Sequence, residues 1–249
     1  MPEQSPVILI DLDRTLIDSS RLKEGFQRYF GEIYAHLGFS EADFSKWTAE
    51  YTDKIGSKTN FDPETLTIFW HERMLEVSSR LPKPLTIPSA KTLATDFNDF
   101  IKSSASDFLY QETVKTLIQL QQLGATLCLF SQGVEVWQLL KLTHSKLAGF
   151  FEKELQFVSS DKTSPDFLQK IRDVLAGKGW EGRTTWLVDD KQEVLSRAQA
   201  IWPDLVTFWI ERQSGKTQMV ENQPDAGTDQ PAASHTRIDS LQRLVEHLQ

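Results

Sequence analysis

The sequence has almost no cysteine: Cys128 is the single one in 249 residues, which excludes an internal disulfide. It also lacks any apolar run of the roughly 20 residues that a membrane helix needs, so we expect no membrane partner. The N-terminus has neither the basic nor the apolar segment of a signal peptide. These absences favour a reducing compartment, and we expect a cytoplasmic protein.

Basic residues are outnumbered, with 27 Lys and Arg against 35 Asp and Glu and a net charge of −8. This balance argues against a nucleic-acid partner, because nucleic-acid binding usually needs a basic surface. The sequence shows no internal repeat at a solenoid period. Its length and its ordinary content of apolar residues (39%) suit one large α/β domain or two smaller ones.

One short segment near the N-terminus combines a buried strand with two acids. Residues 7–10 are consecutive apolar residues, which is typical of a strand inside a parallel sheet. Asp11 and Asp13 follow where this strand should end. In open α/β sheets, ligands bind beyond the carboxyl ends of the strands. The two acids are therefore candidates for a site, although a polar turn is the alternative at this point.

Residues 19–104 have helical spacing throughout and no strand alternation. We expect four helices, with Ser19-Ser20, Ser40, Asp62 and Ser89 as their N-caps. The aromatic residues of the first two helices are expected to pack in the interior of this block: Phe26, Tyr29, Phe30, Trp47 and Tyr51. The sequence thus predicts an all-helical cap domain inserted after one strand.

The rest of the chain alternates between strands and helices. Strands are predicted at 126–130, 155–158, 185–188 and 205–210, with helices between them. This order predicts a Rossmann-like parallel sheet with helices on both faces, in a discontinuous core of residues 1–18 and 105–249. Residues 213–235 are polar and predicted as a flexible loop, and 238–248 as a helix packed on the sheet.

Each later strand is followed by polar residues near its carboxyl end. Ser131 follows one strand, Lys162 lies shortly after the next, and Asp189 and Asp190 follow a third. Because parallel strands end at one edge of the sheet, we expect these groups to meet Asp11 and Asp13 there. Taken singly, Ser131 or an Asp could be a helix cap, and Lys162 a solvated lysine.

The chemistry of this set points to phosphoryl transfer. Carboxylates that lie close together repel unless they share a proton or bind a cation. An oxygen-only set without histidine or cysteine suits Mg²⁺. A cation and a lysine together offset the charge of a phosphoryl group. One carboxylate can then attack phosphorus while a second carboxylate transfers protons.

The order Asp11-x-Asp13-x-Thr15, Ser131, Lys162 and Asp189-Asp190 resembles the four motifs of the haloacid dehalogenase (HAD)-like hydrolase superfamily, in its phosphatase-type majority. The resemblance covers nearly the whole chain. The block at 19–104 also stands where this superfamily often inserts a cap. The resemblance implies a HAD-like phosphatase, which would hydrolyse a small phosphorylated metabolite.

The resemblance also implies roles for individual residues. Asp11 would be the nucleophile, and Asp13 the general acid/base. Ser131 and Lys162 would bind phosphate. The Mg²⁺ ligands would be Asp11, the backbone carbonyl of Asp13, and the pair Asp189 and Asp190. Asp190 is the more plausible direct contact of that pair, and the sequence does not decide between them.

The sequence departs from the family pattern at Arg14, where glycine is commonest in the family, and this puts the shape of the loop after the first strand in doubt. Asp13 disfavours a dehalogenase, which the family implies needs neither a metal nor an acid at that position. A phosphotransferase or phosphomutase of the same superfamily remains an alternative, as does a non-catalytic binding protein. The sequence names neither the substrate nor the oligomeric state.

Overall fold

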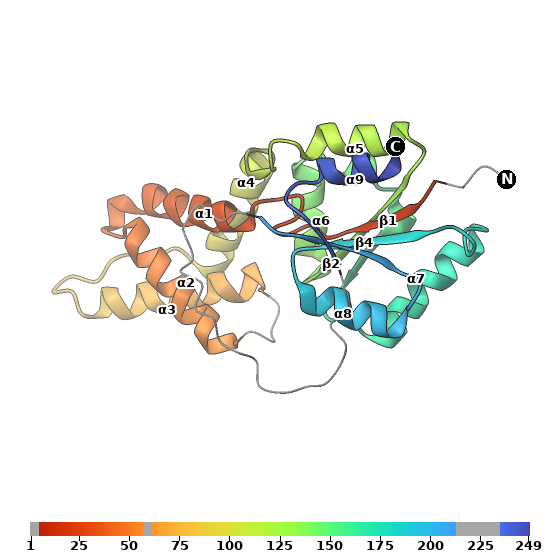
Figure 1. Ribbon diagram of the computed structural model, residues 1–249. Helices are drawn as coiled ribbons and strands as arrows, with labels where there is room; N and C mark the ends of the chain where they lie inside the picture. The colour runs from red at the N-terminus through yellow and green to blue at the C-terminus, as the bar shows by residue number, and fades with distance from the viewer. Residues whose placement is uncertain (1–4, 57–60, 213–234) are drawn as a thin grey trace, which may run out of the picture.

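The computed structural model describes residues 5–56, 61–212 and 235–249, and within them a single parallel sheet forms the centre of the molecule (Figure 1). Its strand order is β3-β2-β1-β4-β5-β6, so the N-terminal strand lies between β2 and β4. The strand bounds are β1 Val7–Ile10, β2 Thr126–Gln132, β3 Gln156–Ser159, β4 Thr185–Asp189, β5 Val206–Ile210 and β6 Thr236–Ile238. The predicted α/β class and parallel sheet are confirmed.

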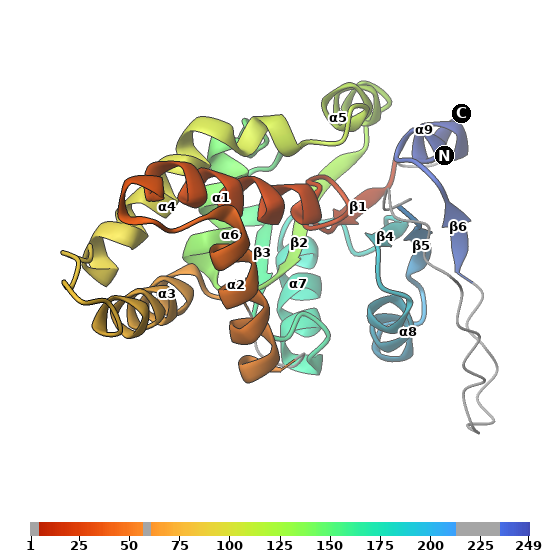
Figure 2. The same cartoon turned by 90° about the vertical axis from the view of Figure 1, so that its left-hand side faces the viewer.

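Both faces of the sheet are covered, which explains why β1 is apolar at every position. Val7 and Leu9 pack on the face covered by α7 and α8, whereas Ile8 and Ile10 pack on the face covered by α5 and α9. Figure 2 shows these two pairs of helices on opposite sides of the strands. The helices are α5 Thr113–Gln122, α6 Glu135–His144, α7 Pro165–Gly177, α8 Gln192–Ile201 and α9 Gln242–Leu248.

Between β1 and α5 the chain forms a helical block made of α1 Ser19–Ile33, α2 Glu41–Ile55, α3 Pro63–Ser79 and α4 Ala90–Ser104. The Ser40, Asp62 and Ser89 side chains cap α2, α3 and α4 as predicted, each accepting a backbone N–H of the first turn. The first helix differs, because its cap is Asp18, whose carboxylate accepts the Arg21 N–H.

The helical block and the sheet share one continuous apolar cluster. Phe30 and Trp70 lie at its centre within the block, with ring centroids 4.7 Å apart. Phe97 of α4 packs against Trp137 of α6, with ring centroids 5.1 Å apart, which joins the block to the sheet region. The division of the chain into a cap domain of residues 19–104 and a separate core stays a prediction.

Several element bounds differ from the sequence prediction. The helical spacing predicts the first helix over 21–37, but the helix ends at Ile33, since residues 35–37 form a 3₁₀ turn before Gly38. Strand β2 runs on to Gln132, so Ser131 lies within the strand rather than after it. Strand β6 was not predicted, and the last helix begins at 242 instead of 238.

Residues 213–234 of the predicted flexible loop lie outside the described residues. Among the residues that the structure describes, no helix has the length and apolar character needed to cross a bilayer.

Candidate active site

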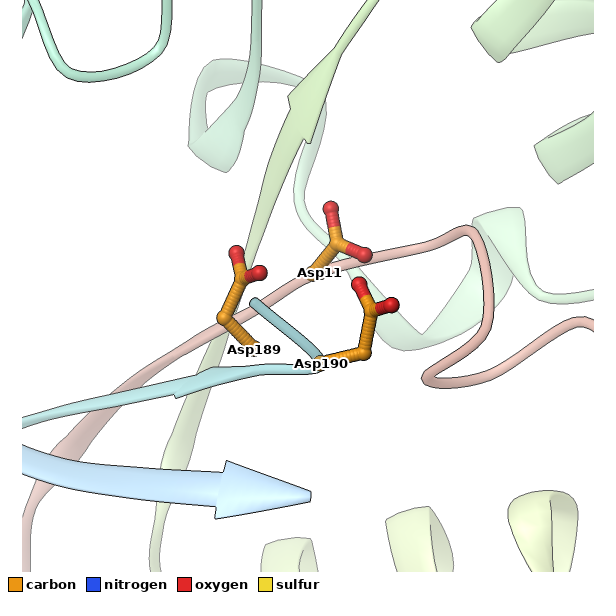
Figure 3. A group of neighbouring side chains, drawn as sticks. All are labelled: Asp11, Asp189 and Asp190. Carbon is orange, nitrogen blue, oxygen red and sulfur yellow. The ribbon is translucent and has the colours of Figure 1, made fainter. Parts of the chain in front are cut away.

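The carboxyl ends of β1 and β4 bring three acids together. Asp11 follows β1 directly, Asp189 ends β4, and Asp190 comes next. Ile10 and Val188 are register partners in these neighbouring strands, so Asp11 and Asp189 stand side by side. Each of the three acids offers one carboxylate oxygen, and these oxygens lie within 4.8 Å of one another. Figure 3 shows the three side chains at adjoining ends of the two strands.

Lys162 supplies the positive charge at this cluster. Its Nζ donates to Asp11 Oδ1 at 2.6 Å and to Asp189 Oδ2 at 2.5 Å, and the lysine side chain is buried. The turn before α7 holds the lysine in place, because the Asp161 carboxylate accepts both the backbone N–H and the hydroxyl of Thr163. Such pairing compensates for burying an ammonium group.

The burial of these groups changes their protonation equilibria. Burial raises the pKa of Asp11, and Lys162 opposes that rise. Burial likewise raises the pKa of Asp189, again against the effect of Lys162. Burial alone would lower the pKa of Lys162, yet the carboxylates of Asp11 and Asp189 hold it above its ordinary value. The lysine therefore carries its charge between two acids that are costly to ionise.

Asp190 is the least satisfied member of the cluster. Burial, followed by the charge of Asp11, raises the pKa of Asp190 to about 6, while Arg14 opposes the rise. Its Oδ2 atom is buried and has no hydrogen-bond partner among the described residues. That oxygen forms an ion pair with Arg14, whose Nε lies 3.3 Å away. Arg14 has a φ of 62°, the left-handed conformation that glycine adopts readily.

The cluster fits a hard divalent cation. Its donors are all carboxylate oxygens, which Mg²⁺ prefers. Asp189 already uses one oxygen for Lys162 and the other for the Lys191 N–H. Asp190 instead presents an oxygen without a hydrogen bond within the described part of the chain. An added cation would satisfy that oxygen and reduce the repulsion between the acids.

Asp13 lies apart from the three-acid cluster. Its carboxylate is bound by α6, where Lys141 Nζ donates to Oδ1 at 2.5 Å and to Oδ2 at 2.6 Å. Gln138 Nε2 donates to Oδ2 at 3.1 Å. The Asp13 side chain remains 31% exposed and lines the same cavity as Asp11. Its side chain can thus reach a ligand in the cavity that Asp11 also lines.

Ser131 is buried within β2, and its hydroxyl has no hydrogen-bond partner among the described residues. The register of β2 against β1 puts Ser131 two positions beyond the partner of Ile10, close to the strand end that carries Asp11. A buried hydroxyl without a partner is unusual in a folded protein.

A cavity of about 410 Å³ opens over these groups. Its polar floor includes Asp11, Asp13, Lys162 and Asp190. Its other wall comes from the helical block and from α6 and includes Lys23, Phe26, Phe61, Trp137 and Lys141. A cavity of about 450 Å³ at the opposite edge of the sheet is lined by none of the predicted site residues. The cavity over the acids is therefore the candidate active site.

Lys141 and Gln138 are the site residues that the sequence did not single out. Both lie on the buried side of α6, next to Trp137 and Leu142. A lysine on the apolar face of an amphipathic helix is the signal that was available, since lysines are rarely buried without a partner.

No protein-family model and no curated protein matches this sequence. Solved structures do match it over almost the whole chain. A putative haloacid dehalogenase-like hydrolase from Burkholderia xenovorans has a TM-score of 0.63, with 17% identity and 98% of each chain covered. The putative HAD-hydrolase YfnB from Bacillus subtilis, described as bound to magnesium, has a TM-score of 0.60, with 17% identity and 99% of each chain covered.

A HAD phosphatase from Thermococcus onnurineus matches with a TM-score of 0.56 and 17% identity, covering 98% of this chain and 97% of that one. L-2-haloacid dehalogenases are also among the similar structures. The chain therefore has the fold of the HAD-like hydrolases, which confirms the resemblance stated from the motifs at the level of the fold. Both phosphatases and dehalogenases share this fold.

Proposed function

We propose that the protein is a Mg²⁺-dependent phosphomonoester hydrolase that acts on a small phosphorylated metabolite through an aspartyl-phosphate intermediate. The observation that carries the proposal is the three-acid cluster of Asp11, Asp189 and Asp190, which contains a buried carboxylate oxygen without a hydrogen bond. Asp13 on the same cavity supplies a second reacting carboxylate.

In the first half of the reaction, an Asp11 oxygen attacks phosphorus and the bond between phosphorus and the ester oxygen breaks. The protonated Asp13 gives its proton to the departing oxygen, which leaves as an alcohol. Lys162 and the Ser131 hydroxyl bind phosphoryl oxygens, and the helical block acts as a cap that limits the access of bulk water.

In the second half, water attacks the phosphorus of the Asp11 acyl phosphate. The Asp13 carboxylate takes a proton from that water, and the products are inorganic phosphate and a free Asp11. A Mg²⁺ ion held by Asp11, Asp190 and the Asp13 backbone carbonyl, with Asp189 beside them, would offset the charge on the phosphoryl oxygens. The alternative within this site is a phosphotransferase, where an alcohol takes the place of water.

Dehalogenases share the fold, but the site argues for phosphorus chemistry. A halide leaves without a proton and its displacement needs no cation, so neither the three-acid cluster nor Asp13 would have a use. A phosphoryl group carries negative charge that a cation and a lysine offset, and its alkoxide leaving group needs a proton. The acids at this site therefore match the demands of a phosphomonoester.

The test is the hydrolysis of p-nitrophenyl phosphate with and without Mg²⁺, comparing the wild-type protein with Asp11→Asn. We expect metal-dependent release of phosphate that falls by at least about 10³-fold in the variant, since the nucleophile is lost. The matched control is Asp53→Asn, an exposed aspartate of α2 that should leave turnover unchanged.

Three results would contradict the proposal. Chloride release from a 2-chloroalkanoate without phosphate release would indicate a dehalogenase. Transfer of phosphate to an added alcohol in preference to water would indicate a phosphotransferase. Binding of a phosphate analogue with no turnover on a panel of phosphomonoesters would indicate a binding protein.

A further inference from the structure

Helix α6 places a buried lysine against Asp13. Lys141 is 2% exposed, and its ammonium group contacts both oxygens of the Asp13 carboxylate. These residues are 128 positions apart in the chain, so the contact depends on how α6 packs over the end of β1. A lysine buried at this level is costly unless a carboxylate pairs with it. Asp13 is that carboxylate.

Gln138, one turn before Lys141, reinforces the contact. Its Nε2 donates to Asp13 Oδ2 at 3.1 Å and to the Gln132 carbonyl at 2.8 Å, so the amide bridges the end of β2 and the acid. The chain leaves space for this bridge at Gly133, where an added Cβ would lie 2.4 Å from Gln138 Nε2. Gly133 also has a φ of 150°, which L side chains rarely adopt.

Three donor contacts therefore fix the orientation of one short carboxylate. Asp13 lies on a loop after β1. The backbone of a loop fixes the direction of a side chain less firmly than a helix or strand does. Lys141 also packs over the Trp137 ring, with Nζ 5.5 Å from the centroid, and this limits the motion of its long side chain. The arrangement is rigid on the side of α6 and open on the side of the cavity.

We propose that Lys141 and Gln138 are positioning residues, which orient the Asp13 side chain at the cavity for proton transfer at the leaving oxygen and at the attacking water. The inference rests on the proposed phosphatase activity and adds to it two residues outside the four motifs. Lys141 and Gln138 contact Asp13, whereas Lys162 contacts Asp11 and is assigned to the phosphoryl oxygens of the substrate.

The leaving group of the substrate tests this role. An alkyl phosphate needs a proton on its departing oxygen, whereas p-nitrophenolate leaves readily without one. Lys141→Gln should therefore lower kcat/KM for an alkyl phosphate such as β-glycerophosphate by at least about tenfold, and for p-nitrophenyl phosphate by less than about threefold. A residue with only a structural role would lower both values by the same factor.

Further variants keep the test decisive. Gln138→Ala should give the same pattern with a smaller loss, and Lys141→Arg, which retains the charge, should recover most of the alkyl phosphate activity. On an Asp13→Asn background, Lys141→Gln should cause no further loss, because the group that it positions is gone. The matched control is Lys170→Gln, an exposed lysine of α7. Thermal unfolding of each variant reports whether it is folded. If Lys141→Gln does not fold, the comparison of the two substrates is made with Gln138→Ala instead.

Equal losses on the two substrates, or a loss that adds to that of Asp13→Asn, would overturn the positioning role while leaving the phosphatase proposal intact. A wild-type protein that hydrolyses neither substrate nor any other phosphomonoester would overturn the proposed function and the inference with it. The activity of the wild-type protein therefore separates the two failures.

Discussion

At the scale of single residues, Arg14 is the clearest departure from what the backbone prefers. Its φ of 62° lies in the left-handed region, which costs a residue with a Cβ roughly 1–2 kcal/mol. The family resemblance places glycine most often at this position, and the observed φ explains that preference. The Arg14 side chain is half exposed and forms an ion pair with the nearly buried Asp190.

This ion pair leads to a prediction for cation binding. The Arg14 guanidinium lies 3.3 Å from the Asp190 oxygen that we assign to Mg²⁺, so the two cations repel each other and compete for the same carboxylate. Arg14→Gly should tighten Mg²⁺ binding by about two- to fivefold, which corresponds to the modest strength of a partly exposed ion pair. Isothermal titration calorimetry with Mg²⁺ measures the change.

The matched control at this position is Arg14→Lys, which keeps the positive charge and should bind Mg²⁺ as the wild-type protein does. Equal affinities for the glycine and wild-type proteins would show that Arg14 does not compete with the ion. Weaker binding by Arg14→Gly would show instead that Arg14 helps to build the cation site.

At the scale of elements, the helical block depends on a close approach between α1 and α2. Gly31 of α1 faces the start of α2, where an added Cβ would lie 2.3 Å from the Glu41 backbone nitrogen. Of the five aromatic residues that the sequence placed in the interior of this block, Phe26, Phe30, Trp47 and Tyr51 are buried, and Tyr29 is only partly buried. The atoms nearest to that Cβ belong to the backbone of α2, which cannot move aside as the end of a flexible side chain could.

Gly31→Ala should therefore destabilise the protein, although alanine favours a helix by about 1 kcal/mol over glycine. Forcing α1 and α2 apart costs about 1–3 kcal/mol beyond that gain. The control is Gly177→Ala at the end of α7, where an added Cβ meets no atom of the described residues within 4 Å, and this change should be neutral or slightly stabilising. Urea unfolding measures both; equal stabilities would contradict the close approach.

The elements that the sequence predicted are those with a strong side-chain pattern. The buried runs at 7–10 and 185–188 were placed within a residue because each strand is apolar on both faces. Strand β6 carries no such pattern, since Thr236 and Arg237 are exposed and only Ile238 is buried. Its pairing with β5 uses backbone groups, which sequence patterns do not reveal.

The same distinction holds for the site. Strand ends in a parallel sheet meet at one edge whatever the loops do, so the proximity of Asp11, Asp189 and Asp190 was predictable. The contact of Lys141 with Asp13 depends instead on the packing of α6, which no local pattern specifies. The roles of Ser131 and Asp13 stay predictions, because geometry alone does not show a reaction.

At the scale of the whole molecule, stability and cation binding are linked through the buried acids. Burial, then Asp11, raises the pKa of Asp190 to about 6 from 3.8, with Arg14 opposing the rise, so the folded metal-free protein binds a proton more tightly than the unfolded chain. The contribution of Asp190 to the stability of the metal-free protein therefore falls as pH rises from about 4 through about 6. At about pH 5 Mg²⁺ must displace that proton, whereas at about pH 7.5 the carboxylate is already ionised. Millimolar Mg²⁺ should therefore raise Tm by several degrees at about pH 7.5. At about pH 5 the rise in Tm should be less than about half as large. Calorimetry measures both shifts. Asp190→Asn should lose them, and Asp53→Asn should keep them. A shift that is equal at both pH values would place the ion elsewhere than on these acids.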